Sequence, residues 1–340
     1  MIDSHSKISA WHSPTFDRPL CGTFSDRERL GLPDHYVDFD LSVTVARAYA
    51  ELRRTADSQL MDLLADSDST LACRLAAGNL LALSGDPRIH TSAPEMIAVP
   101  SGRVEIGLEP DEIDAVMARF STLGLERTWI EKESPRHSVQ LAPYRIARYP
   151  VTNAEYRDFL IETGFQELPS SWEYRQYPQH RSNHPVYTVS EKAADAYAKW
   201  LARRTERGFR LPSEAEWEWA ATGPDGREYP WGSHFEPWLA NTAETGLFAT
   251  SPVGVFTQGD APFGASDMAG NVEEFVSDSY AAYPGGNLVT DHLFQINGSY
   301  RVARGGSFAR FRDLARTRRR HGHNTRSATY AMGFRLAETV

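Results

Sequence analysis

Turn-forming sequences interrupt this chain repeatedly beyond residue 224, and they limit the folds open to it more than any other feature does. The interruptions are YPWG, PVG, AGN and RGGS. Glycine and proline end helices and strands, so this region consists of turns and short segments. The 24 glycines and 20 prolines are spread along the whole chain, together with eight tryptophans. This composition favours an α+β fold rich in loops and short strands over a helical bundle.

The N-terminal part shows helical periodicity instead. Apolar side chains recur at three- and four-residue steps over residues 41–64, and a second stripe runs over residues 68–84. Two such helices joined by a short connection predict a helical hairpin over residues 41–85. Because its apolar faces need a cover, we expect it to pack on the main domain or on a partner. We therefore predict an N-terminal extension of residues 1–93 and one main domain of residues 94–340.

The main domain begins with strand signals. Residues 95–107 alternate as strands do and break at Pro100, Ser101 and Gly102, which predicts a β-hairpin, and residues 138–149 return to strand character. Helix starts follow at N-cap residues and capping boxes. These are Thr152 with Glu155, Ser190, and Ser213 with Glu216.

Charge excludes some partners. The net charge of −9 argues against general nucleic-acid binding, because a protein needs a basic surface to bind the phosphate backbone. No eighteen consecutive residues are apolar, and the N-terminus has no signal-peptide core. We therefore expect a cytoplasmic protein that does not bind a membrane. Residues 301–340 nevertheless hold ten arginines and only two acids, Asp313 and Glu338. Such a segment forms either a pocket for an anionic group or an internal ion-pair network.

Ten motifs follow one another between residues 95 and 335: EMIAVPSGRVEIG, ESPRHSVQLAPYRIARYPVTNAEYRDFL, HPVYTVS, RLPSEAEWEWAA, YPWG, ANTAETG, SPVG, SDMAGNVEEF, RVARGGSF and GFRL. In this order they resemble the formylglycine-generating enzyme (sulfatase-modifying factor) family over residues 94–340. The resemblance implies a loop-rich variant of the C-type lectin fold. Activities in that family include copper-dependent formylglycine formation, iron-dependent sulfoxide synthesis, natural-product maturation and ligand binding without catalysis. The fold alone does not choose between them.

The resemblance also shows what this sequence lacks. The family's two copper-binding cysteines correspond to Arg310 and Ala315, three and eight residues after Ser307. Copper(I) needs soft thiolate ligands, so we expect no formylglycine generation by that mechanism. The iron enzymes take three histidines from an HxxxHxE motif on an N-terminal bundle, and residues 1–93 contain no histidine pair at i, i+4. His321 and His323 are expected to be surface histidines, and whether iron or copper binds elsewhere stays open.

A structural calcium ion is implied by the same resemblance. The family's oxygen ligands correspond to Asp267, Gly270, Val272 and Glu274. A second and weaker site would begin at Asn241 and Thr242, but its aspartate corresponds to Thr245.

The candidate catalytic residues are Glu273, Ser307 and Arg310, with Arg316, Arg318 and Arg319 as candidate substrate-binding residues. Together these groups could bind a zwitterion such as an amino acid, or they could neutralise one another. We predict an oxygen-dependent oxidoreductase acting on an amino acid or peptide with a carboxylate, in a specialised pathway. The alternative is a non-catalytic binding module for an anionic or zwitterionic ligand, with residues 1–93 docking a protein partner.

Overall fold

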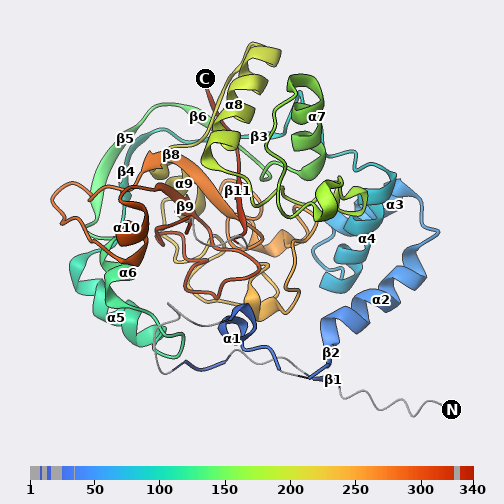
Figure 1. The fold of residues 1–340 in the computed structure, drawn as a ribbon, viewed down its shortest axis with the longest axis horizontal. Helices are drawn as coiled ribbons and strands as arrows, with labels where there is room; N and C mark the ends of the chain where they lie inside the picture. The colour runs from blue at the N-terminus through green and yellow to red at the C-terminus, as the bar shows by residue number, and fades with distance from the viewer. Residues whose placement is uncertain (1–7, 10–13, 17–24, 34, 325–329) are drawn as a thin grey trace.

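The fold contains two four-stranded sheets with short helices around them, and long loops join these elements (Figure 1). The computed structural model describes residues 8–9, 14–16, 25–33, 35–324 and 330–340. His5, His12 and Cys21 lie outside the described residues. The mixed content of helices, strands and loops confirms the α+β prediction.

One sheet has the strand order β3-β6-β12-β7. Its strands are β3 (Met96–Val99), β6 (Tyr144–Ala147), β12 (Ala337–Thr339) and β7 (Gly208–Arg210). The other sheet has the order β10-β9-β8-β11, and β11 runs parallel to β8. Its strands are β8 (Glu273–Ser279), β9 (Arg301–Arg304), β10 (His321–Gly322) and β11 (Met332–Phe334).

Two smaller pairs of strands complete the β-structure. β4 (Gly102–Ile106) pairs with β5 (His137–Leu141), and β1 (Ile8–Ser9) pairs with β2 (Asp38–Phe39). The predicted β-hairpin at Pro100–Gly102 is therefore wrong, because β3 pairs with β6 while β4 pairs with β5. The Pro-Ser-Gly sequence marks the point where the chain passes from one sheet to the next.

The helices of the main domain lie around the sheets. They are α5 (Ile113–Arg119), α6 (Arg127–Glu131), α7 (Asn153–Thr163), α8 (Glu191–Thr205), α9 (Glu214–Thr222) and α10 (His292–Asn297). The predicted helix starts are confirmed. α7 and α9 begin with complete capping boxes, and the Ser190 hydroxyl accepts the Ala193 N–H in the first turn of α8.

The N-terminal extension contains α1 (Asp26–Leu30), α2 (Asp40–Leu52), α3 (Asp57–Ala65) and α4 (Leu71–Ser84). The prediction of one helix over residues 41–64 is wrong, because α2 ends at Leu52 and α3 begins only after Ala56, whose backbone is extended. Both α2 and α3 contact α4, so the apolar spacing continues across the break and conceals it.

α4 packs directly on the main domain, as expected for a helix with an apolar face to cover. The side chain of Asn183 donates to the Gly78 carbonyl at 2.9 Å, and Arg74 Nε donates to the Val255 carbonyl at 2.7 Å. A Cβ at Gly78 would lie 2.8 Å from Pro252, so only glycine allows this approach. The division at residues 93 and 94 stays a prediction.

Candidate active site

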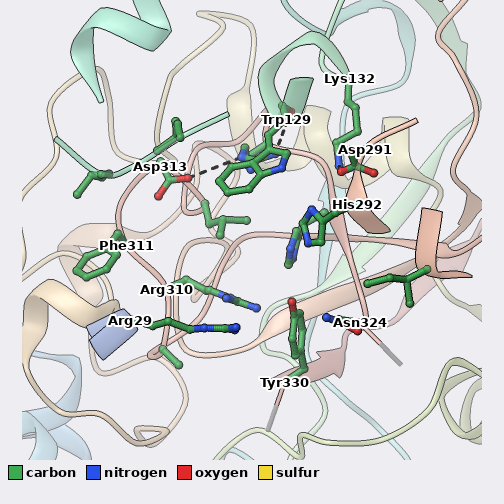
Figure 2. A pocket seen from close by; sticks show the side chains of 17 residues that line it. Arg29, Trp129, Lys132, Asp291, His292, Arg310, Phe311, Asp313, Asn324 and Tyr330 are labelled. Atoms are coloured by element: carbon green, nitrogen blue, oxygen red, sulfur yellow. Dashed lines mark hydrogen bonds and ion pairs between the residues drawn. The ribbon is translucent and has the colours of Figure 1, made fainter. Parts of the chain in front are cut away.

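A cavity of about 440 Å³ lies between α6, the start of α10, residues 309–324 and Tyr330 (Figure 2). Four cationic and two acidic side chains line it: Arg29, Lys132, Arg310, Arg319, Asp291 and Asp313. Trp129, Phe311 and Tyr330 supply aromatic surface. The cavity is therefore partly apolar with an excess of positive charge, and α1 of the N-terminal extension contributes to its wall.

Of the predicted catalytic residues, Arg310 lines this cavity, whereas Glu273 and Ser307 are not among its lining residues. Glu273 begins β8, and its N–H donates to the Ala331 carbonyl at 2.8 Å. Gly306 has φ +68°, and a Cβ there would lie 2.9 Å from the backbone of Leu314. This close turn leads to Ser307, whose buried hydroxyl has no hydrogen-bond partner within the described residues.

Glu273 forms the centre of a buried charge cluster. Arg310 Nε donates to Glu273 Oε1 at 3.0 Å, and His321 Nδ1 donates to Glu273 Oε2. Burial alone would raise the pKa of Glu273, but the charges and hydrogen bonds of His321 and Arg310 outweigh it and lower the pKa to about 2. Burial lowers the pKa of His321 to about 4, against the opposing effect of Glu273. Near neutral pH the carboxylate is therefore ionised and the imidazole is neutral.

Tyr330 holds the two partners of Glu273 in place. The Arg310 guanidinium lies 4.4 Å from the centre of the Tyr330 ring, and the His321 ring stacks on the same ring at 5.8 Å. Figure 2 shows Arg310 and Tyr330 on the wall of the cavity. The expectation that His321 is a surface histidine is wrong, since it is only 7% exposed. It stands in β10, where pairing with β9 turns it toward Glu273.

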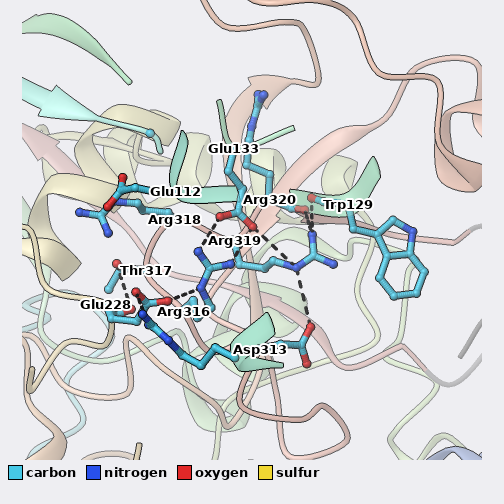
Figure 3. A network of polar contacts seen from close by, with 12 residues as sticks. Glu112, Trp129, Glu133, Glu228, Asp313, Arg316, Thr317, Arg318, Arg319 and Arg320 are labelled. Carbon is cyan, nitrogen blue, oxygen red and sulfur yellow. Dashed lines mark hydrogen bonds and ion pairs between the residues drawn. The ribbon is translucent and has the colours of Figure 1, made fainter. Parts of the chain in front are cut away.

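The arginine-rich segment forms an internal ion-pair network (Figure 3). Arg316 binds both oxygens of Glu133, at 3.0 and 2.8 Å, and also pairs with Glu228. Other arginines of the segment pair with carboxylates from distant parts of the chain, namely Arg301 with Asp195, Arg304 with Glu218, Arg312 with Glu244, Arg320 with Glu214 and Arg335 with Glu274. For these arginines, the structure supports the interpretation as an internal network.

The three predicted substrate-binding arginines separate in space. Arg319 lines the cavity and donates to the carbonyls of Trp129 and Arg320, each at 3.0 Å. Arg316 is 1% exposed inside the network, and Arg318 faces a different groove beside Gly226. Only Arg319 is thus placed to meet a ligand in the cavity, and that role stays a prediction.

The predicted calcium ligands do not fit a divalent cation in this arrangement. Both oxygens of Glu274 accept hydrogen bonds from Arg335 at 2.6 Å, and one also accepts from Trp217 Nε1 at 2.7 Å. Asp267 accepts the Gly254 N–H at 2.7 Å, and burial raises its pKa to about 7. The Arg335 guanidinium occupies the position at the Glu274 carboxylate that a calcium ion would take. At Gly270 and Val272 the predicted ligands are backbone carbonyl oxygens, and these two stay predictions.

The weaker second site is similar. Asn241 Oδ1 is buried and has no partner among the described residues, but Thr242 Oγ1 donates to Glu244 at 2.8 Å. The Glu244 carboxylate is in turn bound by Arg312. Across the described part of the chain, no three histidine, cysteine, aspartate or glutamate side chains are grouped to hold a metal. Nor is any helix in that part long and apolar enough to cross a membrane.

Comparison with known proteins identifies the fold. Residues 83–340 match the family described as the sulfatase-modifying factor enzyme 1-like domain. Hercynine oxygenase of Mycolicibacterium smegmatis is 30% identical over 323 residues, covering 78% of this chain and 71% of that protein. The mouse inactive C-alpha-formylglycine-generating enzyme 2 is 28% identical and aligns over 77% of this chain and 92% of its own length.

Among solved structures, PvdO from Pseudomonas aeruginosa superposes with a TM-score of 0.56 and 26% identity, covering 73% of this chain and 95% of PvdO. The matched residues include both four-stranded sheets and the whole wall of the cavity except Arg29. The resemblance seen in the ordered motifs is thereby confirmed. The chain belongs to the sulfatase-modifying factor enzyme 1-like family.

Proposed function

We propose that this chain is a formylglycine-generating-enzyme-like oxidoreductase that oxidises an amino acid or peptide carrying a carboxylate, with dioxygen as the oxidant. The observation that carries the proposal is the buried pair of Glu273 with His321, whose ring lines the cavity. The name of the hercynine oxygenase relative supports an oxygen-dependent reaction. Copper–thiolate chemistry is not part of the proposal, because Arg310 and Ala315 stand where the family's cysteines would be.

The Glu273–His321 pair prepares one nitrogen atom for chemistry. Because Nδ1–H is donated to the carboxylate, the neutral imidazole keeps its free lone pair on Nε2. That atom can accept a proton from a substrate bound in the cavity, as a general base does. A carboxylate behind a histidine also orients the ring for binding a metal ion. In both cases Nε2 of His321 is the reactive atom, and Glu273 positions it.

The charges of the cavity favour a substrate with a carboxylate. Four cationic side chains face two acidic ones, and Lys132 is already paired with Asp291 at 2.6 Å. Among the described residues, no carboxylate lies closer to Arg319 than 3.8 Å, the distance from its Nε to Asp313 Oδ2. A guanidinium in this position can bind a substrate carboxylate through two parallel hydrogen bonds. The volume of about 440 Å³ suits an amino acid or the end of a peptide.

An oxygen-uptake assay tests the proposal. Purified protein, loaded with iron(II), with copper(I) or with no metal, is mixed with the twenty amino acids, hercynine and a cysteine-containing peptide. We expect one of these probes to cause substrate-dependent oxygen uptake. If none raises uptake above the blank under any metal condition, the oxidoreductase proposal is overturned.

Two variants then test the role of the pair. Glu273→Gln keeps the shape of the side chain but removes its charge, and His321→Gln removes the base. We expect each to lower kcat by roughly 100-fold, the usual scale of general-base catalysis. Asp114→Asn is the matched control, because it removes a carboxylate of a surface ion pair far more exposed than Glu273. Glu273→Gln with unchanged kcat would show that the pair is structural.

A second candidate is a non-catalytic binding module that uses the same cavity. It is favoured by the match to a mouse relative whose name calls it inactive. Isothermal titration with the same probes distinguishes the two. Binding that Arg319→Gln weakens, without oxygen uptake, would support the binding module. Docking of a protein partner on residues 1–93 stays a prediction.

A further inference from the structure

A second concave site lies outside the cavity described above. This groove of about 580 Å³ is bordered by Arg119, Arg136, Arg312, Arg318, Glu112 and Glu228. Figure 3 shows Arg318 and Glu112 on one side of the Arg316 network and Trp129, which lines the cavity, on the other. We call it the arginine groove. It shares no lining residue with the cavity.

Arg318 differs from the other arginines of its segment. It is 7% exposed, and its Nη2 donates to the Gly226 carbonyl at 2.7 Å. No carboxylate among the described residues lies within ion-pair distance of it, whereas Arg316 and Arg320 each bind a glutamate. A buried guanidinium without a carboxylate keeps donors directed into the groove.

A second guanidinium converges on the same place. The position that a Cβ of Gly226 would occupy lies 3.1 Å from Arg318 Nη2 and 3.9 Å from Arg136 Nη2. Arg136 Nε is buried and has no hydrogen-bond partner in the described structure, and Glu109 is 3.8 Å from its Nη1. Two cations held this close repel each other unless an anion lies between them.

The glutamates of the groove do not supply that anion. Glu228 is already shared by Arg316 and Arg119, the latter at 3.0 Å. Glu112 directs its carboxylate to the backbone N–H of Glu109 at 3.1 Å. Arg312 is paired with Glu244 at 3.2 Å. The donors of Arg318 and Arg136 therefore remain available for a group from solution.

We propose that the arginine groove binds a phosphate group of a small molecule, held between Arg318 and Arg136. Two guanidinium forks match the several oxygens of a tetrahedral dianion better than they match a single carboxylate. The groove is larger than a bare phosphate ion, which leaves room for the rest of such a molecule beside Tyr229 and Phe235. This site is separate from the proposed oxidoreductase cavity and does not depend on that function.

Titration with inorganic phosphate tests the proposal, using ³¹P NMR and calorimetry at low ionic strength. We expect the wild-type protein to bind phosphate, and Arg318→Gln and Arg136→Gln each to weaken binding by about tenfold or more. Arg157→Gln is the matched control, because Arg157 forms a surface pair with Asp158 on α7 and its loss should leave binding unchanged. The folding of each variant is checked by its thermal midpoint, and Arg136→Gln carries the test if Arg318→Gln does not fold.

Three results would overturn the proposal. The first is no phosphate binding by the wild-type protein at roughly 10 mM phosphate, a concentration that detects even millimolar affinity. The second is unchanged binding in Arg136→Gln. The third is displacement of phosphate by an equal concentration of acetate, which would assign the groove to carboxylates instead. Amino-acid binding in the cavity reports separately on the proposed function, so the two can fail independently.

Discussion

Replacing Glu133 with glutamine should destabilise the protein strongly, because it removes the central carboxylate of a buried network. Glu133 is fully buried and accepts two hydrogen bonds from Arg316. Glutamine keeps one acceptor oxygen, but it places an NH₂ group against the guanidinium. Removing one partner of a buried ion pair costs about 3–5 kcal/mol, since the remaining charge stays desolvated. Glu228 still binds Arg316, so we expect a loss near the lower limit, about 3 kcal/mol.

Differential scanning calorimetry measures this loss. For a chain of 340 residues, 3 kcal/mol corresponds to a decrease in Tm of about 4 °C. The control is Asp114→Asn, which breaks an ion pair whose side chains are 50% and 83% exposed. Exposed pairs contribute about 0–1 kcal/mol, so this control should change Tm by no more than about 1.5 °C.

A double-mutant cycle with Arg316→Met separates the pair from the rest of the network. Arg316→Met leaves Glu133 buried without its main partner, so the single variant should also lose stability. Since Glu133→Gln removes that unpaired charge, the double variant should be more stable than the sum of the two losses predicts, by about 2 kcal/mol. Additive losses, or a Glu133→Gln midpoint equal to that of Asp114→Asn, would refute the reasoning.

Three further predictions concern other parts of the molecule. Gly78→Val should force α4 away from Pro252, lower stability by about 1–3 kcal/mol and speed limited proteolysis before residue 85; an unchanged cleavage pattern would contradict this packing. Burial lowers the pKa of His184 to about 3, so the folded state binds fewer protons than the unfolded state between pH 6.5 and 3, and stability should fall as pH decreases through that window. A His184→Gln variant should show a smaller decrease in Tm between pH 7 and pH 4, and an identical pH profile would exclude His184 as a cause. Calcium chloride should not raise Tm above its value in EGTA, because Arg335 binds both oxygens of Glu274; a clear rise would show that Glu274 exchanges Arg335 for the ion.

Local signals in the sequence predicted the helix starts well. A capping box such as Thr152 with Glu155 is complete within four residues, so its energetics do not depend on the rest of the fold. Pairing of strands depends on distant residues instead. β3 resembles half of a hairpin, yet its partner β6 lies more than forty residues further along the chain. The turn signal at Pro100–Gly102 was real, but it could not show which strands pair.

The candidate site was predictable only in part. Glu273 stands in a motif that resembles one of the family, Arg310 lies two residues after another, and their ion pair was one of the expected outcomes. His321 is 48 residues from Glu273 in a run of arginines, and nothing in its local pattern indicates burial. Arg29 is even further from Glu273 in the sequence. Its helix, α1, reaches the cavity only through the folded arrangement of the N-terminal extension. Contacts of this kind follow from tertiary packing, which local spacing does not encode.

The position of β12 has a consequence for how the chain is synthesised. β12 pairs with β6 on one side and with β7 on the other, through Ala337 opposite Ile146 and opposite Arg210. On the ribosome, β6 and β7 emerge long before residues 337–339 do. Each strand therefore exposes an unpaired edge until β12 has been made, and exposed edges are templates for pairing with other chains. The nascent protein is most prone to aggregate in this interval, which ends when β12 inserts between its two neighbours.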